Sequence, residues 1–403
     1  MKNLLKIGLG IVTSIGGFLD AGTIATAALA GAAFGFQLLW VVILGTGCVI
    51  LLTEMCGRLA AVSHHSLSDA IRERLGFRYF AVPLVGEVLV DLLVLAAEIG
   101  GVAIAVHLVT GITYLWFVPI CALGLWALLW LGTFSAIENG VSLAGMVTLS
   151  FVVAAFGMDP PWREIARGAV PSLPSRDAAQ YWFLAVGIIG ALITPYVLNF
   201  YATGAIEEKW TVKDIAVNRV IAATGMSFGS IVAMSMLVLA ALVLGTRGIQ
   251  VDSYEQAALV LTQPFGRWGL YLFAASLGVA CLGAALQVSL NLAYVVAQGF
   301  GWNWSENLKP HEDARFAAVY TAAILASSTL LFVGDPIGLT TLSMALNAVI
   351  APLVVFPLLV IMNDRAYLRD HRNHVLGNLL VASVVVLAFV VAAVAIPLEV
   401  FGG

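Results

Sequence analysis

The sequence predicts an all-α integral membrane protein with about 11 transmembrane helices. Of the 403 residues, 61% are hydrophobic and only 10% are charged, whereas a soluble domain usually carries about 25% charged residues. The apolar residues form long runs, and a helix needs roughly 20 residues to cross the hydrocarbon core of a bilayer. They do not alternate every second residue, as the strands of a membrane β-barrel would. The lipid bilayer is therefore an expected partner of this chain.

Eleven apolar segments follow one another along the chain. No stretch between them is long enough for a separate soluble domain, so residues 1–403 are predicted to form a single transmembrane domain. The longest polar connections are expected to be loops with room for a short surface helix, and they cover residues 63–80, 158–180 and 300–314. The spans are predicted at residues 7–33, 36–62, 82–109, 113–132, 138–157, 181–206, 219–246, 268–299, 315–333, 337–362 and 376–398.

The Lys and Arg residues in the loops indicate the orientation, because cytoplasmic loops are enriched in them. With the N-terminus in the cytoplasm, 14 of the 19 Lys and Arg residues lie on the inner side. We therefore expect a multi-pass protein of the cell's inner (plasma) membrane with a cytoplasmic N-terminus. An odd number of spans places the C-terminus outside.

Two of the predicted spans are interrupted near their middle. The first contains Asp20-Ala21-Gly22-Thr23 in a glycine-rich stretch, and the sixth contains Thr194-Pro195. Pro195 has no backbone N–H, so a carbonyl of the preceding turn loses its helical hydrogen bond. Interrupted helices at matching positions of two halves are the best sequence indication of a transporter's binding site.

The spacing of the two interrupted spans predicts an inverted repeat, since they lie five spans apart. Spans 1–5 form the first repeat, at about residues 7–157. Spans 6–10 form the second, at about 181–362, and the segment 376–398 is an additional span.

Asp20 is the main candidate for a metal ligand. A carboxylate inside a span costs at least a few kcal/mol unless it is paired or hydrated. Further oxygen ligands come from Thr23, from Thr194 and from a freed carbonyl, that of Ala191 or of Leu192, and such ligands suit Mg²⁺, Ca²⁺ or Mn²⁺. The structural alternatives are that Asp20 only caps a half-helix and that Thr194 only marks a proline kink.

The third span carries a stripe of acids that includes Asp91 and Glu98. Carboxylates inside a span indicate an ion or proton path, although Asp91 and Glu87, which shares its face, could instead lie near the membrane surface. Tyr196 and Asn347 are further candidates for this path. Asn347 and Met344 have simpler interpretations, as a helix–helix hydrogen bond and a packing residue.

These residues resemble those of the NRAMP divalent-metal transporters over nearly the full length of the chain. That family carries Asp-Pro-Gly-Asn in the first span and Met-Pro-His in the sixth, where this sequence has Asp20-Ala21-Gly22-Thr23 and Thr194-Pro195-Tyr196. The segment from Ala97 to Ile104 resembles the family's acidic third helix. The resemblance implies a LeuT-like inverted repeat with broken helices 1 and 6, and alternating access.

The departures from the family pattern concern the ligands. The family's soft methionine is Thr194 here, its asparagine is Thr23, and its span-ten glutamine is Met344. The histidine tied to proton transfer is Tyr196, and a third-helix aspartate is Leu95. The pattern resembles the NRAMP-related magnesium transporter branch, which implies a divalent-cation transporter selective for hard ions, Mg²⁺ and also Mn²⁺, with weak or absent proton coupling.

Other classes of function stay open or are disfavoured. On the same fold, the chain could be a Na⁺- or H⁺-coupled symporter of a small organic solute, or a non-transporting receptor or scaffold. No catalytic set of residues, nucleotide-binding loop or base-binding motif is visible. We therefore expect neither an enzyme nor a resident cofactor, and no nucleic acid as a partner.

Overall fold

The computed structural model describes residues 19–131, 140–141, 143–174 and 176–401, and within these ranges every regular element is a helix. Eight of the described helices are long and apolar enough to cross a membrane. Three shorter apolar helices, at Ala21–Phe34, Gly145–Gly157 and Ala314–Leu330, coincide with the remaining predicted spans. The prediction of an all-helical membrane protein with about eleven spans is confirmed. Residues 7–18 of the first predicted span lie outside the described residues.

The helices fall into long spans and shorter connecting pieces. The spans are α2 (Ala21–Phe34), α3 (Leu39–Ser63), α5 (Phe77–Thr110), α6 (Phe117–Leu131), α8 (Leu149–Gly157), α10 (Ala178–Leu192) with α11 (Pro195–Glu207), α12 (Ile215–Val243), α14 (Arg267–Phe300), α15 (Ala314–Leu330), α16 (Pro336–Asn363) and α18 (Val375–Phe401). The connecting helices are α4 (Leu67–Leu75), α9 (Trp162–Gly168), α13 (Tyr254–Phe265) and α17 (Arg365–Leu368). The single turns are η1 (Tyr114–Trp116), η2 (Gly145–Thr148), η3 (Val212–Asp214) and η4 (Gly245–Arg247).

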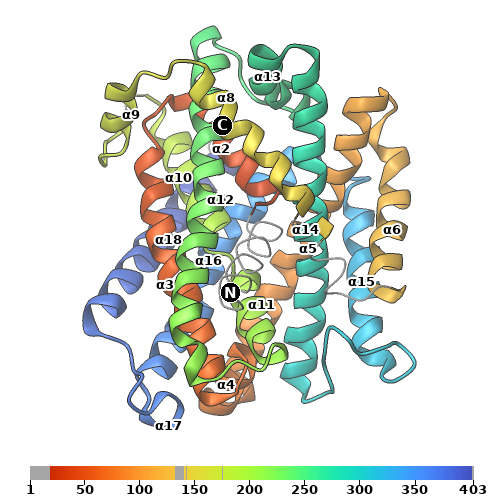
Figure 1. The fold of residues 1–403 in the computed structure, drawn as a ribbon, viewed down its shortest axis with the longest axis vertical. Coiled ribbons are helices and arrows are strands. Elements are labelled where there is room, and N and C mark those ends of the chain that lie inside the picture. The colour runs from red at the N-terminus through yellow and green to blue at the C-terminus, as the bar shows by residue number, and fades with distance from the viewer. Residues whose placement is uncertain (1–18, 132–139, 142, 175, 402–403) are drawn as a thin grey trace.

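The connecting helices lie at the two ends of the bundle. Figure 1 shows α4 and α17 at one end and α9 and α13 at the other. Helix α13 was not predicted from the sequence. It begins with a capping box. The side chain of Ser253 accepts a hydrogen bond from the backbone N–H of Gln256, and the side chain of Gln256 accepts one from the backbone N–H of Ser253. This Ser-x-x-Gln spacing is a sequence signal for a helix start.

Small residues allow the central helices to pack closely, as is common in membranes. Helix α5 packs along α14, α2 against α12, and α10 against α16. At Gly190 of α10, an added Cβ would lie 1.8 Å from the carbonyl oxygen of Met344 on α16. At Gly31 of α2, it would lie 2.2 Å from the carbonyl oxygen of Leu237 on α12. Both interrupted spans are thus held against neighbours by backbone-to-backbone contact.

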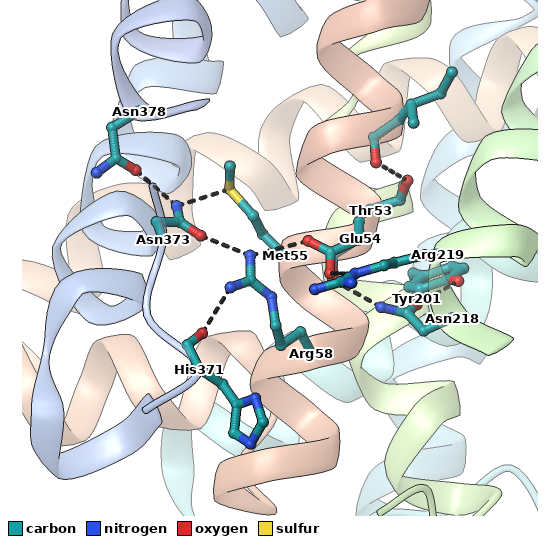
Figure 2. Close-up of polar contacts among 11 residues, drawn as sticks. Thr53, Glu54, Met55, Arg58, Tyr201, Asn218, Arg219, His371, Asn373 and Asn378 are labelled. Atoms are coloured by element: carbon teal, nitrogen blue, oxygen red, sulfur yellow. Dashed lines mark hydrogen bonds and ion pairs between the residues drawn. The ribbon is translucent and has the colours of Figure 1, made fainter. Parts of the chain in front are cut away.

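A polar cluster ties the α4 end of α3 to two other parts of the chain. Arg58 donates to Glu54 at 2.9 Å, to the carbonyl of His371 at 2.6 Å and to Asn373 Oδ1 at 2.7 Å (Figure 2). Asn218 of α12 donates to the carbonyl of Glu54 at 2.9 Å. Since Arg58 is buried, these bonds fix α3 against both α12 and the segment that joins α17 to α18.

Candidate functional site

Asp20 lies at the start of α2, where the first described helix begins inside the bundle. Its backbone is extended (φ −134°, ψ 175°), and its Oδ1 accepts a hydrogen bond from the N–H of Thr23 at 2.6 Å. Glu98 of α5 adds a second carboxylate to the same helix end, since both of its oxygens lie 3.1 Å from the N–H of Ala21. Two buried carboxylates therefore face the positive end of the α2 dipole.

The second break separates α10 from α11. The last helical turn of α10 closes with the N–H of Ile193 bonded to the carbonyl of Ile189 at 2.8 Å, and Thr194 is extended (φ −85°, ψ 131°). Pro195 occupies the first position of α11. Because the carbonyl of Ala191 would accept from residue 195 in a continuous helix, it is the carbonyl that the proline leaves free.

The structure brings the two breaks together. The hydroxyl of Tyr196, in the first turn of α11, donates to Asp20 Oδ2 at 3.4 Å. The side chains of Thr23 and Thr194 are buried, and neither hydroxyl has a hydrogen-bond partner of acceptable geometry among the described residues. A buried polar atom without a partner costs about 1–3 kcal/mol. The unpaired hydroxyls are thus available to a ligand between the two breaks.

Met344 of α16, which the sequence indicated as a packing residue, lies at the α2 break. A Cβ added at Gly22 would lie 2.4 Å from the Sδ of Met344, so the thioether packs directly on the glycine and would have to move for any larger residue. Asn347 points its Nδ2 at the same sulfur, at 3.9 Å, and its Oδ1 has no partner among the described residues. The α2 break therefore has sulfur and amide oxygen beside it as well as carboxylates and hydroxyls.

The acids of α5 are divided between two places. Glu98 lies at the α2 break, whereas Asp91 lies two turns along α5 towards α4, hydrogen-bonded to Asn291 at 3.0 Å. Glu87 is also buried and shares Asn291 with Asp91, so its carboxyl group lies between helices of the bundle. The predicted stripe thus splits into a carboxylate at the break and a separate buried pair.

Tyr254 was not recognised from the sequence as part of this region. It is the first residue of α13, which lies outside the predicted spans, yet its buried hydroxyl reaches the carbonyl of Ala21 at 3.4 Å and the hydroxyl of Thr340 at 3.2 Å. A tyrosine that follows a helix-capping serine carries no sequence signal for such a contact, because the contact depends on how α13 folds back over the bundle.

The two breaks would offer a metal ion several oxygen atoms, with the Glu98 carboxylate and the Met344 sulfur close by. No group of three or more His, Cys, Asp or Glu side chains that could hold a metal ion occurs among the described residues. Asp20, the Thr23 and Thr194 hydroxyls and the Ala191 carbonyl would instead supply single oxygens, as hard cations accept.

Comparison with known proteins shows a match to one family over nearly the whole chain. The family model described as "Natural resistance-associated macrophage protein-like" (Nramp) matches residues 10–398. The divalent metal cation transporter MntH of Aeromonas hydrophila is 29% identical over 405 residues, covering 95% of this chain and 94% of its own length. MntH of Ralstonia nicotianae is 29% identical over 391 residues, covering 92% and 86%.

Solved structures share the fold. The Eremococcus coleocola manganese transporter, in complex with an aromatic bis-isothiourea substituted compound, superposes with a TM-score of 0.81 at 19% identity, covering 98% of this chain and 87% of its own. Mhp1, a nucleobase-cation-symport-1 family transporter in a closed conformation, gives a TM-score of 0.61 at 14% identity, covering 96% and 91%. The likeness reaches beyond a single family to transporters that bind organic solutes.

Proposed function

This chain belongs to the Nramp family, and from that premise we propose that it moves a divalent metal cation across the membrane. The ion binds between the α2 break and the α10–α11 break, with Asp20 as the charged ligand. The MntH relatives are named as divalent metal cation transporters. The observation that supports the same activity here is a buried carboxylate beside two unpaired hydroxyls where two helices are interrupted.

We propose oxygen ligands from both breaks. Asp20 and Thr23 contribute from the start of α2, and Thr194 and the carbonyl of Ala191 contribute from the α10–α11 break. Tyr196 and Glu98 act on the site through Asp20 and Ala21, which they contact directly. A metal ion between these groups would give the two hydroxyls the partner that they lack.

We further propose that the site accepts Mg²⁺ as well as Mn²⁺. The Eremococcus coleocola protein that shares this fold is a manganese transporter. Thr194 offers an oxygen, and oxygen ligands discriminate little between the two ions, while Mg²⁺ keeps several of its waters. The resemblance also implies weak proton coupling at the metal itself, since Tyr196 and Leu95 stand where the family has a histidine and an aspartate.

Access to the site is proposed to alternate between the two membrane faces, by movement of one inverted repeat against the other. In this proposal the end of the bundle that holds α4 and α17 faces the cytoplasm of the cell whose plasma membrane contains the protein. The Lys and Arg asymmetry supports that orientation.

The wild-type protein in liposomes tests this function directly. We expect uptake of Mn²⁺ and of Mg²⁺, each competing with the other, and little acidification of the lumen that scales with metal uptake. Protein-free liposomes and liposomes treated with ionophore serve as controls. If Mn²⁺ enters but millimolar Mg²⁺ neither enters nor competes, the hard-ion proposal fails. If no divalent ion enters, metal transport itself is wrong and an organic solute or a non-transporting role takes its place.

A further inference from the structure

The first turn of α13 is held to the rest of the bundle at two points. The buried hydroxyl of Tyr254 lies 3.4 Å from the carbonyl of Ala21, at the α2 break, and 3.2 Å from the hydroxyl of Thr340 on α16. The next residue, Glu255, forms an ion pair with His107 near the end of α5, with 3.1 Å between Oε1 and Nε2. The side chains of this pair are 48% and 25% exposed, so the pair is within reach of water.

Both ring nitrogens of His107 face hydrogen-bond acceptors. Nδ1 lies 2.7 Å from the carbonyl oxygen of Ile112, in the turn that follows α5, and Nε2 faces the carboxylate of Glu255. A carbonyl and an ionised carboxylate can only accept hydrogen bonds, and a neutral imidazole has a single N–H to donate. Only the doubly protonated ring satisfies both contacts. The geometry around His107 is therefore that of a positively charged imidazolium.

The other ionisable groups around this end of α5 do not replace His107 as the partner of Glu255. On α5 itself the nearest is Glu98, at the α2 break. Helix α2 carries none between its ends, and Arg315 and Tyr320 of α15 lie in its first two turns, away from His107. The groups on the remaining neighbours are Tyr254 of α13, Tyr114 of η1, Cys121 of α6, Asp335 before α16, and Arg267, Tyr271 and Cys281 of α14. Of these only Arg267 is a cation, and in the described part of the chain it forms no ion pair with Glu255.

The two ends of α13 are held differently. Near its last turn the backbone packs on α14, since a Cβ added at Gly269 would lie 2.0 Å from the carbonyl oxygen of Leu261. The segment before its first turn contains Gly248 at φ 66°, where a Cβ would meet nothing within 4 Å. Such a glycine serves the backbone conformation and can absorb a change in direction. The first turn is thus the end of α13 that can leave the bundle.

We propose that His107 and Glu255 form a pH-sensitive latch, which holds the first turn of α13 over the α2 break. In acid, the His107 ring takes a proton from water, one N–H bond forms, and the imidazolium donates to Ile112 and Glu255 together. In alkali the ring keeps one N–H, so one of the two contacts is lost. Histidine is the side chain that changes its charge near neutral pH. The latch is therefore closed in acid and weakens as the pH rises.

The latch acts on access to the metal site, because Tyr254 and Glu255 are neighbours in the chain. When the first turn of α13 leaves α5, the Tyr254 hydroxyl also leaves Ala21 and Thr340, which opens the α2 break towards the α13 end of the molecule. Partly exposed ion pairs are weak, so we expect changes of about threefold. This inference goes beyond the proposed function, and the latch itself does not depend on which ion is carried.

Hydrogen–deuterium exchange of the full chain in detergent tests the latch. Exchange in peptides from the first turn of α13 is measured at about pH 5.5 and about pH 8, on either side of the range in which histidine titrates, and corrected for the pH dependence of the chemical step. We expect wild type to exchange about threefold faster at the higher pH. His107→Gln and Glu255→Gln, two independent variants at exposed positions, should each give the same corrected rate at both pH values. Equal corrected rates in wild type, or a pH difference that survives in both variants, would overturn the proposal.

His65→Gln is the matched control. His65 has the same two kinds of partner, with Nδ1 2.8 Å from the carbonyl of Ser63 and Nε2 3.0 Å from Glu73, but it lies at the α4 end of the bundle. This variant should keep the pH difference that wild type shows in α13. Loss of the difference in His65→Gln would indicate a general effect of pH on the bundle and would count against the latch.

Initial uptake of Mn²⁺ into liposomes tests whether the latch controls access. Uptake by wild type should rise about threefold with external pH over the same range, and uptake by His107→Gln should stay level. Identical pH profiles for the two proteins would show that α13 does not control entry and would overturn that part of the proposal. If wild type takes up no Mn²⁺ at any pH, the proposed function fails, while the exchange experiment still decides whether the latch exists.

Discussion

At the α2 break, the structure shows that Asp20 caps the half-helix, which leaves its second oxygen for other contacts. Its Oδ1 caps the half-helix through Thr23, while its Oδ2 faces Tyr196. The sequence predicted a functional role for the Asp20 carboxylate, because an unpaired charge inside a membrane span is energetically costly. It did not indicate the thioether of Met344 against Gly22, because that contact depends on how α16 crosses α2.

At the scale of single residues, we expect the preference among metal ions to depend on the side chain at position 194. Replacing the Thr194 hydroxyl by a thioether in Thr194→Met should favour Cd²⁺ over Mg²⁺, since sulfur prefers softer ions. We expect the ratio of the two affinities to change by about tenfold, or 1.4 kcal/mol. The measurement is competition between Cd²⁺ and Mg²⁺ for Mn²⁺ uptake into liposomes.

Thr194→Val is the matched control for that substitution. It removes the oxygen without adding sulfur, so it should weaken the binding of both ions and leave their ratio near that of wild type. The same ratio in wild type, Thr194→Val and Thr194→Met would show that Thr194 does not face the ion.

At the scale of single elements, the apolar runs predicted the long helices, because each span must be apolar for about the thickness of a bilayer. They could not predict α13, because this 12-residue helix is too short to be a membrane span and its start is marked only by the Ser253 capping box. Nor could they predict the cluster around Arg58, because its partner Asn373 lies more than 300 residues further along the chain. Contacts between distant segments follow from the packing of the helices.

Two arginines contact Glu54, and we expect Arg58 to contribute more to the stability of the fold than Arg219. Arg58→Ala removes the buried partner of Glu54 and the donor to His371 and Asn373. It should cost about 3–5 kcal/mol of stability, as expected when one partner of a buried ion pair is lost. Arg219 contacts Glu54 from a side chain that is 66% exposed, so Arg219→Ala should cost less than about 1 kcal/mol.

Thermal unfolding in detergent, followed by circular dichroism, compares the two variants. Equal losses of stability would contradict the interpretation that Arg58, because it is buried, stabilises the contact between α3 and the segment before α18 more than Arg219 stabilises its own contact.

For the whole molecule, the order of the broken spans predicted an inverted repeat, and the resemblance to the NRAMP family implied the LeuT-like fold. Breaks in the first and sixth spans indicate an inverted repeat, and the superposition on the manganese transporter confirms the fold, with a TM-score of 0.81. The sequence could not predict that the acids of α5 divide between the metal site and a separate pair. Their distribution depends on where Asn199 and Asn291 approach α5.

The central claim is that a metal ion passes the membrane by binding Asp20 between the two breaks. Mn²⁺ flux into liposomes with Asp20→Ala tests it most directly, alongside Asp252→Asn, a control at an exposed acid outside the site. Both variants must elute as single folded peaks. The account predicts that Asp20→Ala reduces flux to the level of protein-free liposomes, while Asp252→Asn stays close to wild type. Near-normal flux through folded Asp20→Ala would contradict it.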